Sequence, residues 1–376
     1  MLIGVPLETA TGETRVAATA ETVGRLVARG HQVIVQRGAG WAASQLDAAY
    51  VSAGAQLGDA SDALRAQIVL KVRAPSEIEL KKMKHGSVVI GMLDPFNAQS
   101  TSAMAAAGLT AFALEAAPRT TRAQSMDVLS SQANIAGYRA VIEATRLYQR
   151  FMPMLMTAAG TVKAARLLVI GAGVAGLQAI ATARRLGAVI EASDVRPAAK
   201  EQIESLGAKF LDVPYLTDEE REIAHGTGGY ARQMPADWLR RQAERVDERA
   251  AAADIVITTA LIPGRPAPVL LHESTVRKMR PGSVVIDLAA GRGANGAGNC
   301  PLTQPDRVVE CHGVVIAGYT NLPSMVAADA SALYARNVLD FLNLVIDNTG
   351  RFAVNVDDEI VAACLMCRDG ELARKA

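Results

Sequence analysis

Residues 167–196 read LLVIGAGVAGLQAIATARRLGAVIEASDVR, and this stretch decides the fold. Leu167 to Ile170 form a short apolar run that predicts a buried parallel strand. Gly171 to Gly176 follow at once and match the pattern G-x-G-x-x-G. A helix is predicted next, then a second strand from Ala188 to Ala192, with Asp194 at its carboxyl end. The order strand, glycine turn, helix, strand and acid is typical of a Rossmann unit that binds a dinucleotide.

Each part of the glycine turn has a physical role. Gly171 permits a sharp turn, Gly173 lets a pyrophosphate approach the main chain, and Gly176 lets the helix pack closely on the strand. The helix N-terminus presents unpaired N–H groups to the phosphates. We therefore expect the whole turn to bind the cofactor, through Gly171, Ala172, Gly173, Val174, Ala175 and Gly176.

The residues after the second strand bear on which nucleotide is bound. A carboxylate at Asp194 would accept hydrogen bonds from the adenosine ribose hydroxyls and would repel a 2′-phosphate. Arg196 instead favours NADP(H), because NADP sites hold the 2′-phosphate with a nearby arginine. Since the carboxylate comes first, at the strand end, the expected cofactor is NAD(H), with contacts from Asp194, Val195 and Arg196.

A second G-x-G-x-x-G runs from Gly291 to Gly296, after the apolar run Val284 to Ala289. No helical pattern and no strand with a terminal acid follow it, so it is not predicted to bind phosphate, and its role stays open.

Cys364 and Cys367 form a C-x-x-C pair that no further Cys/His signature completes. Reduced, partly buried thiols are therefore predicted there, without a disulfide.

Composition bounds the class of protein. At 376 residues and 50% hydrophobic, the chain can form two domains with large cores. The net charge of +1 gives no indication of nucleic-acid or anionic-membrane binding. No apolar run reaches the roughly 18 residues of a spanning helix, and no signal-peptide pattern opens the chain, so a soluble cytoplasmic protein is expected. The histidines are all expected at turns or at the surface, and no metal or hydrolase pattern includes them.

Short apolar runs alternate with helix-length stretches up to residue 118, which predicts another parallel sheet, without a glycine fingerprint. The fold class is therefore α/β, with two Rossmann-like doubly wound parallel-sheet domains and an interdomain cleft for the ligand. The expected domains are residues 1–130 with 320–376, and residues 131–319. The expected strands of the first domain are Leu2–Val5, Gln32–Val35, Ile68–Val72, Val88–Met92 and Leu109–Leu114.

Two long helices are predicted to join the domains, one from about Ser131 to before Pro153 and one from roughly Ser324 to Ile346. Their helically spaced apolar residues indicate core packing. These residues are Tyr138, Val141, Tyr148 and Met152 in the first helix, and Tyr334, Val338, Phe341 and Val345 in the second.

Two polar stretches each keep two interpretations. The segment from Pro118 to Gln132 is dense in side-chain donors and acceptors, and it is either a solvated loop with a helix cap or a ligand-binding segment. The glycine-rich run from Gly226 to Tyr230 is either a lid over a bound nucleotide or a plain surface loop.

Several blocks resemble the NAD(H)-binding alpha subunit of proton-translocating NAD(P) transhydrogenase. They are RAQSMDVLSSQANIAGYRAV (122–141), TAAGTVKAARLLVIGAGVAGLQAIATARRLGA (157–188), TTALIPGRPAPVL (258–270) and TNLPSMVAADAS (320–331). The resemblance covers nearly the whole chain. It includes the lack of membrane spans, as in the separate alpha subunits of some bacteria.

The resemblance implies an enzyme of the Si/Re-specific, proton-translocating type, in which this component holds NADH and passes hydride to NADP⁺. The implied partners are an NADP(H)-binding component, a membrane-spanning proton-channel component and a second copy of this chain. The implied location is cytoplasmic, peripheral to the inner membrane. The family's side chains around the dihydronicotinamide match Arg119, Gln124, Asp127 and Ser130, its mobile-loop residues match Tyr230 and Met234, and further cofactor contacts match Thr259, Ala260 and Leu261.

The same fold is similar to that of alanine dehydrogenase. Arg15 and the stretch Lys71 to Arg73 resemble the substrate pocket of that enzyme. That enzyme needs a catalytic histidine and a later aspartate, and here Asp94 and Gly291 stand in those places. Oxidative deamination must move protons on and off the amine, so loss of the base disables it. Hydride transfer between two nicotinamides needs only position, orientation and exclusion of water. Two alternatives stay open: an amino-acid dehydrogenase and an NAD(H)-sensing binding module.

Overall fold

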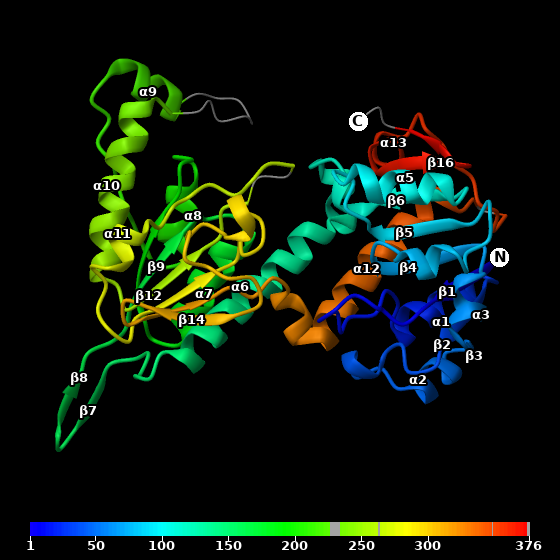
Figure 1. Cartoon of the computed structure of the whole chain (residues 1–376), viewed down its shortest axis with the longest axis horizontal. Helices are drawn as coiled ribbons and strands as arrows, with labels where there is room; N and C mark the ends of the chain where they lie inside the picture. The colour runs from blue at the N-terminus through cyan, green and yellow to red at the C-terminus, as the bar shows by residue number, and fades with distance from the viewer. Residues whose placement is uncertain (226–233, 262–263, 348, 374–376) are drawn as a thin grey trace. The chain divides into compact units, whose positions relative to one another are not determined.

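The computed structural model describes residues 1–225, 234–261, 264–347 and 349–373. The chain divides into two compact units, unit 1 with Met1–Gln132 and Pro323–Ala376, and unit 2 with Ala133–Leu322 (Figure 1). Each unit has a mainly parallel sheet with helices packed on it, which confirms the expected α/β class. None of the helices in the described ranges is long and apolar enough to cross a membrane.

The sheet of unit 1 is parallel from β3 to β6 and ends in an antiparallel edge at β16 and β17. Alternate residues of its central strand face two separate cores, Leu70 one and Val69 the other, as a doubly wound sheet requires. The strands, in spatial order, are β17 (Glu371–Leu372), β16 (Leu365–Arg368), β6 (Thr110–Ala113), β5 (Val88–Met92), β4 (Ile68–Arg73), β1 (Leu2–Val5), β2 (Gln32–Gln36) and β3 (Gln56–Gly58).

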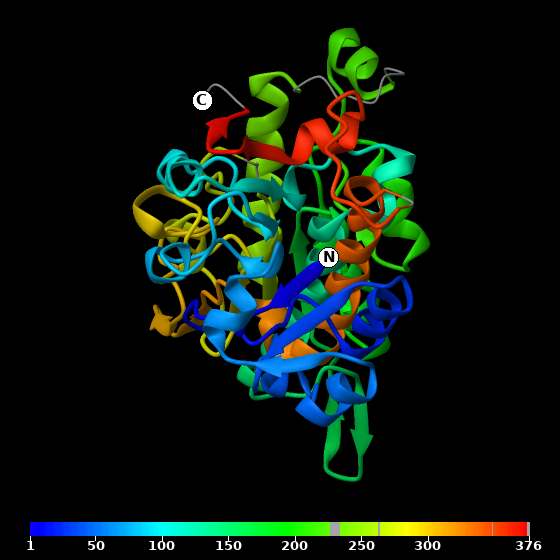
Figure 2. The same cartoon turned by 90° about the vertical axis from the view of Figure 1, so that its right-hand side faces the viewer.

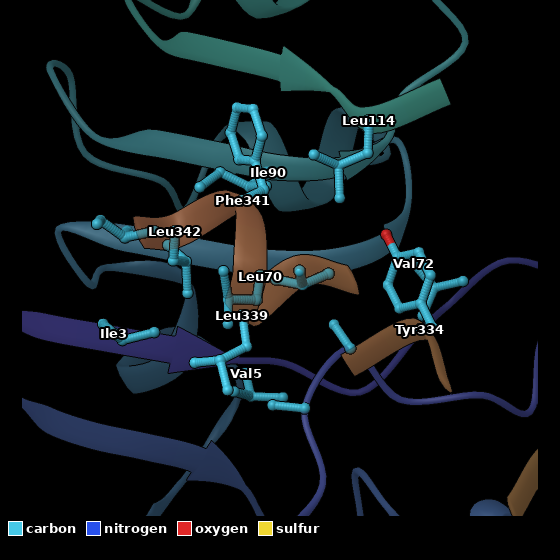
Figure 3. Packing of buried hydrophobic residues seen from close by; sticks show 14 of the residues in the cluster. Ile3, Val5, Leu70, Val72, Ile90, Leu114, Tyr334, Leu339, Phe341 and Leu342 are labelled. Atoms are coloured by element: carbon cyan, nitrogen blue, oxygen red, sulfur yellow. The ribbon is translucent and has the colours of Figure 1, made fainter. Parts of the chain in front are cut away.

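The helical elements of unit 1 include one long helix from the C-terminal region of the chain, α12, which packs on the sheet (Figure 3). In Figure 3 its Phe341 and Leu339 lie among side chains of the strands. The ring centroids of Phe341 and Phe112 are 5.4 Å apart. The buried stripe expected on this helix is confirmed. The elements are α1 (Ala20–Ala28), η1 (Trp41–Ala43), α2 (Asp47–Ser52), α3 (Ala60–Leu64), α4 (Glu77–Leu80), α5 (Ala98–Ala106), η2 (Leu114–Ala116), η3 (Thr121–Met126), α12 (Ala327–Val345) and α13 (Glu359–Cys364).

The sheet of unit 2 has the strand order of a dinucleotide-binding Rossmann fold, with the antiparallel strand β14 at one edge. Leu167 and Val169 face one core and Leu168 and Ile170 the other, so the central strand is covered on both sides. The strands, in spatial order, are β11 (Lys209–Phe210), β10 (Val189–Ser193), β9 (Arg166–Ile170), β12 (Ile255–Thr258), β13 (Val284–Asp287), β15 (Val314–Ala317) and β14 (Val308–Cys311).

The remaining elements include a hairpin of β7 (Leu155–Thr157) and β8 (Gly160–Val162), which projects from the rest of unit 2 (Figures 1 and 2). Helix α6 begins in unit 1 and continues into unit 2, and the short η5 crosses the second boundary between the units. The helices are α6 (Val128–Leu147), α7 (Val174–Arg185), α8 (Ala199–Ser205), α9 (Asp218–His225), α10 (Ala236–Ala252), α11 (Glu273–Val276), η4 (Ala294–Gly296) and η5 (Leu322–Val326).

The expected core stripe of α6 is wrong at Tyr138, whose side chain is 42% exposed, although Val141, Tyr148 and Met152 are buried. The small residues Gly137, Ala140 and Ala144 are also buried on this helix. A Cβ atom on Gly137 would lie 2.1 Å from the carbonyl oxygen of Ala175, so the two helices approach closely there. Close approach selects small residues, and it turns the neighbouring tyrosine outward.

The surface position expected for His31 is also wrong, because its side chain is only 6% exposed. It lies in the turn between α1 and β2, and its Nδ1 atom has no hydrogen-bond partner among the described residues. Burial lowers the pKa of His31 and favours the neutral ring. Cys364 and Cys367, expected as partly buried reduced thiols, are both fully buried where α13 runs into β16.

Candidate functional site

The glycine turn lies at the carboxyl end of β9, in the backbone conformation that its sequence predicts. Gly171 has φ +98°, which favours glycine strongly. A Cβ atom on Gly176 would lie 1.9 Å from the carbonyl oxygen of Gly171, so helix α7 can pack this closely only without a side chain there. A Cβ atom on Gly173 would meet no atom within 4 Å among the described residues. The turn therefore packs closely against the rest of the unit at Gly176, and it leaves open space at Gly173.

The N-terminus of α7 is available to an anion. Its N-cap residue is Gly173, and no side chain caps the helix. The first N–H groups of an α-helix have no partner within the helix and carry a partial positive charge. An uncapped end beside an open glycine is the arrangement that holds a pyrophosphate in dinucleotide folds. The residues present thus fit a dinucleotide phosphate.

Asp194 follows β10 and is tied to the glycine turn. Its Oδ2 atom accepts a hydrogen bond from the backbone N–H of Ala172 at 2.7 Å, and its Oδ1 atom accepts one from the N–H of Arg196 at 2.8 Å. The Arg196 guanidinium donates to both oxygens, at 2.9 and 3.0 Å. Burial alone would raise the pKa of Asp194, but the donors from Arg196 and Ala172 hold it below its usual value. The carboxylate is therefore ionised at neutral pH.

Ribose hydroxyls approaching Asp194 would have to share its oxygens with Arg196 or displace that side chain. The Arg196 side chain is 49% exposed, so it can move aside without unpacking a core. Val195 lies between the two and is exposed. The ribose contact expected from the sequence stays a prediction, and the arginine that competes for it is one that the sequence already indicated.

The loop that follows β12 is tied to the same turn. The N–H of Thr259 donates to the carbonyl oxygen of Ile170 at 2.9 Å, and its hydroxyl donates to that of Gly171 at 2.9 Å. Ala260 and Leu261 come next, and Leu261 is exposed. Both backbone polar groups of Ala260 are bonded to Asn299, a residue that the sequence did not single out. The structure therefore brings the expected residues Gly171, Thr259 and Ala260 together.

The polar segment of unit 1 is fixed by long-range contacts. Arg122 forms a bidentate ion pair with Asp358, at 2.7 and 2.6 Å. Asn337 on α12 donates from Nδ2 to the carbonyl oxygen of Ser125 at 2.7 Å. These partners lie more than 200 residues away in the sequence, so no local pattern could reveal them. These contacts fix the backbone of the segment, while many of its side chains are exposed.

Two of the four expected nicotinamide contacts are engaged with each other. Asp127 caps α6: its Oδ1 atom accepts from the N–H of Ser130 at 2.9 Å, and its Oδ2 atom accepts from the Ser130 hydroxyl at 2.5 Å. Arg119 and Gln124 are exposed, and within the described ranges neither side chain makes a hydrogen bond or an ion pair. These two side chains are therefore free to meet a ligand.

The resemblance matches Tyr230 and Met234 to a mobile loop of the family. Tyr230 lies outside the described residues. Met234 is buried, and it packs with Val213 and Trp238 in a small apolar cluster of unit 2. A contact between Met234 and a cofactor, which the resemblance implies, stays a prediction and would require its side chain to leave this cluster.

The cationic residues that resemble an amino-acid pocket are paired inside unit 1. The Nε atom of Arg15 donates to Glu13 at 2.7 Å, and the Nε atom of Arg73 donates to the same carboxylate at 2.9 Å. Lys71 is buried and contacts Glu79 at 2.6 Å. Although burial would raise it, the two arginines lower the pKa of Glu13 to about 2. An internal carboxylate thus already binds the arginines that a substrate carboxylate would need.

Asp94, which the resemblance matches to the catalytic histidine of alanine dehydrogenase, adopts a left-handed backbone conformation with φ +56°. Glu115 holds this turn, since its carboxylate accepts from the N–H groups of Leu93 at 3.1 Å and Asp94 at 2.7 Å. Burial raises the pKa of Glu115 to about 7, despite those two donors. This carboxyl group therefore titrates near neutral pH in the folded chain.

Replacing Glu115 should change how stability depends on pH. Between its ordinary pKa of 4.5 and about 7, folded Glu115 keeps a proton that the unfolded chain releases. Folding stability therefore falls as pH rises through that window, and the loss is complete above about pH 7. In Glu115→Gln this loss is absent, so the unfolding midpoint should vary less from about pH 5 to pH 8 in thermal unfolding. The exposed Glu371→Gln is the control, and identical pH profiles for Glu115→Gln and wild type would contradict the assignment.

Within the described residues there is no group of three or more His, Cys, Asp or Glu side chains placed to hold a metal ion.

Comparisons with known proteins place the chain in a family. The models for the alanine dehydrogenase/PNT N-terminal and C-terminal domains match residues 4–136 and 140–375. The chain is 49% identical to the NAD(P) transhydrogenase alpha subunit polypeptide of Rhodospirillum rubrum, over 100% of this chain and 98% of that protein.

Solved structures agree with this placement. The crystal structure of transhydrogenase from Sinorhizobium meliloti is 48% identical, with a TM-score of 0.89 over 99% of this chain and 100% of that one. A solved L-alanine dehydrogenase is 28% identical, with a TM-score of 0.81 over 99% of this chain and 96% of that one. The chain therefore belongs to the alanine dehydrogenase/PNT family, as a relative of the NAD(P) transhydrogenase alpha subunits.

Proposed function

We propose that this chain is the NAD(H)-binding component of a proton-translocating NAD(P) transhydrogenase and passes hydride from NADH to NADP⁺ held on a partner component. The observation that carries the proposal is the open, uncapped N-terminus of α7 at Gly173, beside the ionised Asp194. Family membership and the 49% identity to a transhydrogenase alpha subunit support the same activity.

In this proposal, some residues bind the dinucleotide and others orient its nicotinamide ring. Bound NADH supplies the hydride. The N–H groups of α7 hold the pyrophosphate, and Asp194 holds the adenosine ribose and disfavours a 2′-phosphate. Arg119 and Gln124 offer exposed donors on a fixed segment, and we assign them, with Asp127 and Ser130, to the nicotinamide ring on the strength of the resemblance.

This assignment needs no catalytic base. Hydride transfer between two nicotinamides depends on distance, alignment and exclusion of water, and not on proton transfer by a side chain. The expected domains, residues 1–130 with 320–376 and residues 131–319, would then have distinct tasks. The second domain would bind the dinucleotide, and the first would orient its reactive end.

The proposed partners are the NADP(H)-binding component and the membrane-spanning proton-channel component, which would place the chain at the cytoplasmic side of the inner membrane. The relatives named subunit alpha support a complex of several subunits. A second copy of the chain is also proposed as a partner. The β7–β8 hairpin supports this, because a two-stranded hairpin is marginally stable alone, and this one and the segment before it carry the exposed apolar residues Phe151, Met154 and Met156.

Polar residues on the hairpin should weaken the homodimer. Met154→Ser with Met156→Ser removes two exposed methionines, and Met156 is 74% exposed. If a second chain covers them, the dimer dissociation constant should rise about tenfold or more, as measured by analytical ultracentrifugation. The control is Leu216→Ser, an exposed apolar residue elsewhere in unit 2. A monomeric wild type, or an unchanged dissociation constant in the variant, would refute the hairpin interface.

Two assays of the whole chain test the proposed activity. Mixed with a purified NADP(H)-binding component, the chain should support hydride transfer between NADH and an NADP⁺ analogue. With NADH, pyruvate and ammonia it should give no turnover, because Arg15 and Arg73 are already bound to Glu13. Turnover with pyruvate and ammonia would favour the amino-acid dehydrogenase. NADH binding without transfer to the partner component would favour the sensing module.

A further inference from the structure

We propose that Asn299 is a positioning residue: it holds the backbone N–H and C=O of Ala260, and with them the loop after β12, in the conformation that accepts NAD(H). This inference rests on the proposed function and deepens it. It also gives a role to the second glycine-rich segment, Gly291 to Gly298, for which the sequence alone indicated none.

The side chain of Asn299 satisfies both polar groups of one residue. Its Oδ1 atom accepts from the N–H of Ala260 at 3.1 Å, and its Nδ2 atom donates to the carbonyl oxygen of Ala260 at 2.9 Å. The Nδ2 atom also donates to the carbonyl oxygen of Pro268 at 2.8 Å. A primary amide offers a donor and an acceptor in one plane, which an aliphatic side chain or a carboxylate does not. Asn299 is fully buried, so water cannot replace these bonds.

Asp287 binds the backbone after Asn299 and lies close to the glycine before it. It is fully buried, and its Oδ2 atom accepts from the N–H of Cys300 at 3.0 Å and from the hydroxyl of Thr303 at 2.7 Å. A Cβ atom on Gly298 would lie 2.2 Å from the same oxygen, so the chain can pass the carboxylate only as glycine. The glycine-rich segment thus packs around the buried carboxylate of Asp287, and this packing positions Asn299 beside Ala260.

The same network reaches the glycine turn that is proposed to hold the pyrophosphate. Oδ1 of Asp287 accepts from the hydroxyl of Thr258 at 3.0 Å, at the end of β12. The next residue, Thr259, donates from its hydroxyl to Gly171. Ala260, held by Asn299, follows directly. Asp287 and Asn299 therefore hold the ends of a three-residue stretch whose middle residue binds the turn.

A buried polar network of this kind favours one loop conformation, because each broken bond would leave a buried donor or acceptor unpaired. Nucleotide binding would then need no ordering of residues 259–261, and the affinity would benefit from that preorganisation. Loss of the amide should loosen the loop before any nucleotide is added.

The test compares Asn299→Ala and Asn299→Asp with a matched control, Ser283→Ala. Ser283 is buried in the same unit, and its hydroxyl donates to the carbonyl oxygen of Ala253 at the amino end of the sheet. Three quantities are measured on the whole chain: amide hydrogen exchange at Ala260 without nucleotide, the NADH dissociation constant by fluorescence titration, and the thermal unfolding midpoint.

Both Asn299 variants should speed exchange at Ala260 more than tenfold and raise the NADH dissociation constant about tenfold or more. Ser283→Ala should lower the unfolding midpoint but leave the other two quantities unchanged. Unchanged exchange and unchanged affinity in folded Asn299 variants would overturn the proposal, and so would equal changes in Ser283→Ala.

A milder variant covers the case in which the Asn299 variants do not fold. Thr303→Val keeps the side-chain shape but removes one hydroxyl bond to Asp287, so it should speed exchange at Ala260 by a smaller factor. No change in that variant would overturn the proposal. Failure of the wild-type chain to bind NADH would instead refute the proposed function, while exchange at Ala260 would still decide whether Asn299 positions the loop.

Discussion

Gln124→Asn should slow hydride transfer from bound NADH about a hundredfold while changing the NADH dissociation constant less than about threefold. The substitution keeps the amide but draws it back by one methylene. Gln124 is exposed and has no side-chain partner in the described ranges, and its segment is fixed by the Arg122–Asp358 ion pair and by Asn337. The backbone therefore cannot follow the shortened side chain. Because we assign Gln124 to the orientation of the nicotinamide, the loss falls on transfer and not on binding.

The measurement is single-turnover transfer to an NADP⁺ analogue on the partner component, at saturating NADH, beside an NADH titration of the chain alone. Gln99→Asn is the control, an exposed glutamine of unit 1 on another helix. Equal losses in binding and in transfer would show that Gln124 contributes affinity and would contradict the orienting role.

Asp194→Ala should raise the NADH dissociation constant between about tenfold and a hundredfold, with little change in transfer at saturation. The carboxylate holds the N–H of Ala172 in the glycine turn at 2.7 Å, and we propose that it also accepts the ribose hydroxyls. Its removal leaves that N–H unpaired and the Arg196 guanidinium without its partner. A hydrogen bond to a charged group contributes about 1.5–3 kcal/mol, which corresponds to the expected loss.

The control for this variant is Asp212→Ala, an exposed carboxylate in the same unit that pairs with Lys200. NADH and NADPH dissociation constants are measured by titration for both variants. NADH affinity should fall in Asp194→Ala, and the preference for NADH over NADPH should narrow, because the charge that repels a 2′-phosphate is gone. Unchanged NADH affinity would show that the ribose contact lies elsewhere.

Local patterns were enough to predict the centre of unit 2. The apolar run of β9, the glycine turn and Asp194 lie close together in the sequence, and the structure has each in the expected conformation. The edges of the sheet in unit 1 were not predicted. β3 has three residues, of which only Gly58 is buried, and β16 pairs with β6, which lies some 250 residues earlier, so neither leaves a periodic pattern in the sequence.

The same limit applies to the candidate site. The resemblance pointed to Gln124 and Thr259, whose contacts with a cofactor stay predictions. Local spacing could not reveal Asn299 or Asp358, because a hydrogen bond across the fold leaves no trace in it. At Tyr138 a local pattern was present but gave a wrong prediction. It had the spacing of a core residue, but the close approach of α6 and α7 selected the small residues beside it for the buried face.

A crystal structure of the chain with NADH bound would decide whether the glycine turn at the start of α7 holds the dinucleotide. We expect the pyrophosphate against the turn from Gly171 to Gly176, the adenosine ribose at Asp194, and the dihydronicotinamide beside Gln124 with one face open to solvent. A dinucleotide bound at the second glycine-rich segment, Gly291 to Gly296, or a reduced ring enclosed on both faces by this chain, would contradict it.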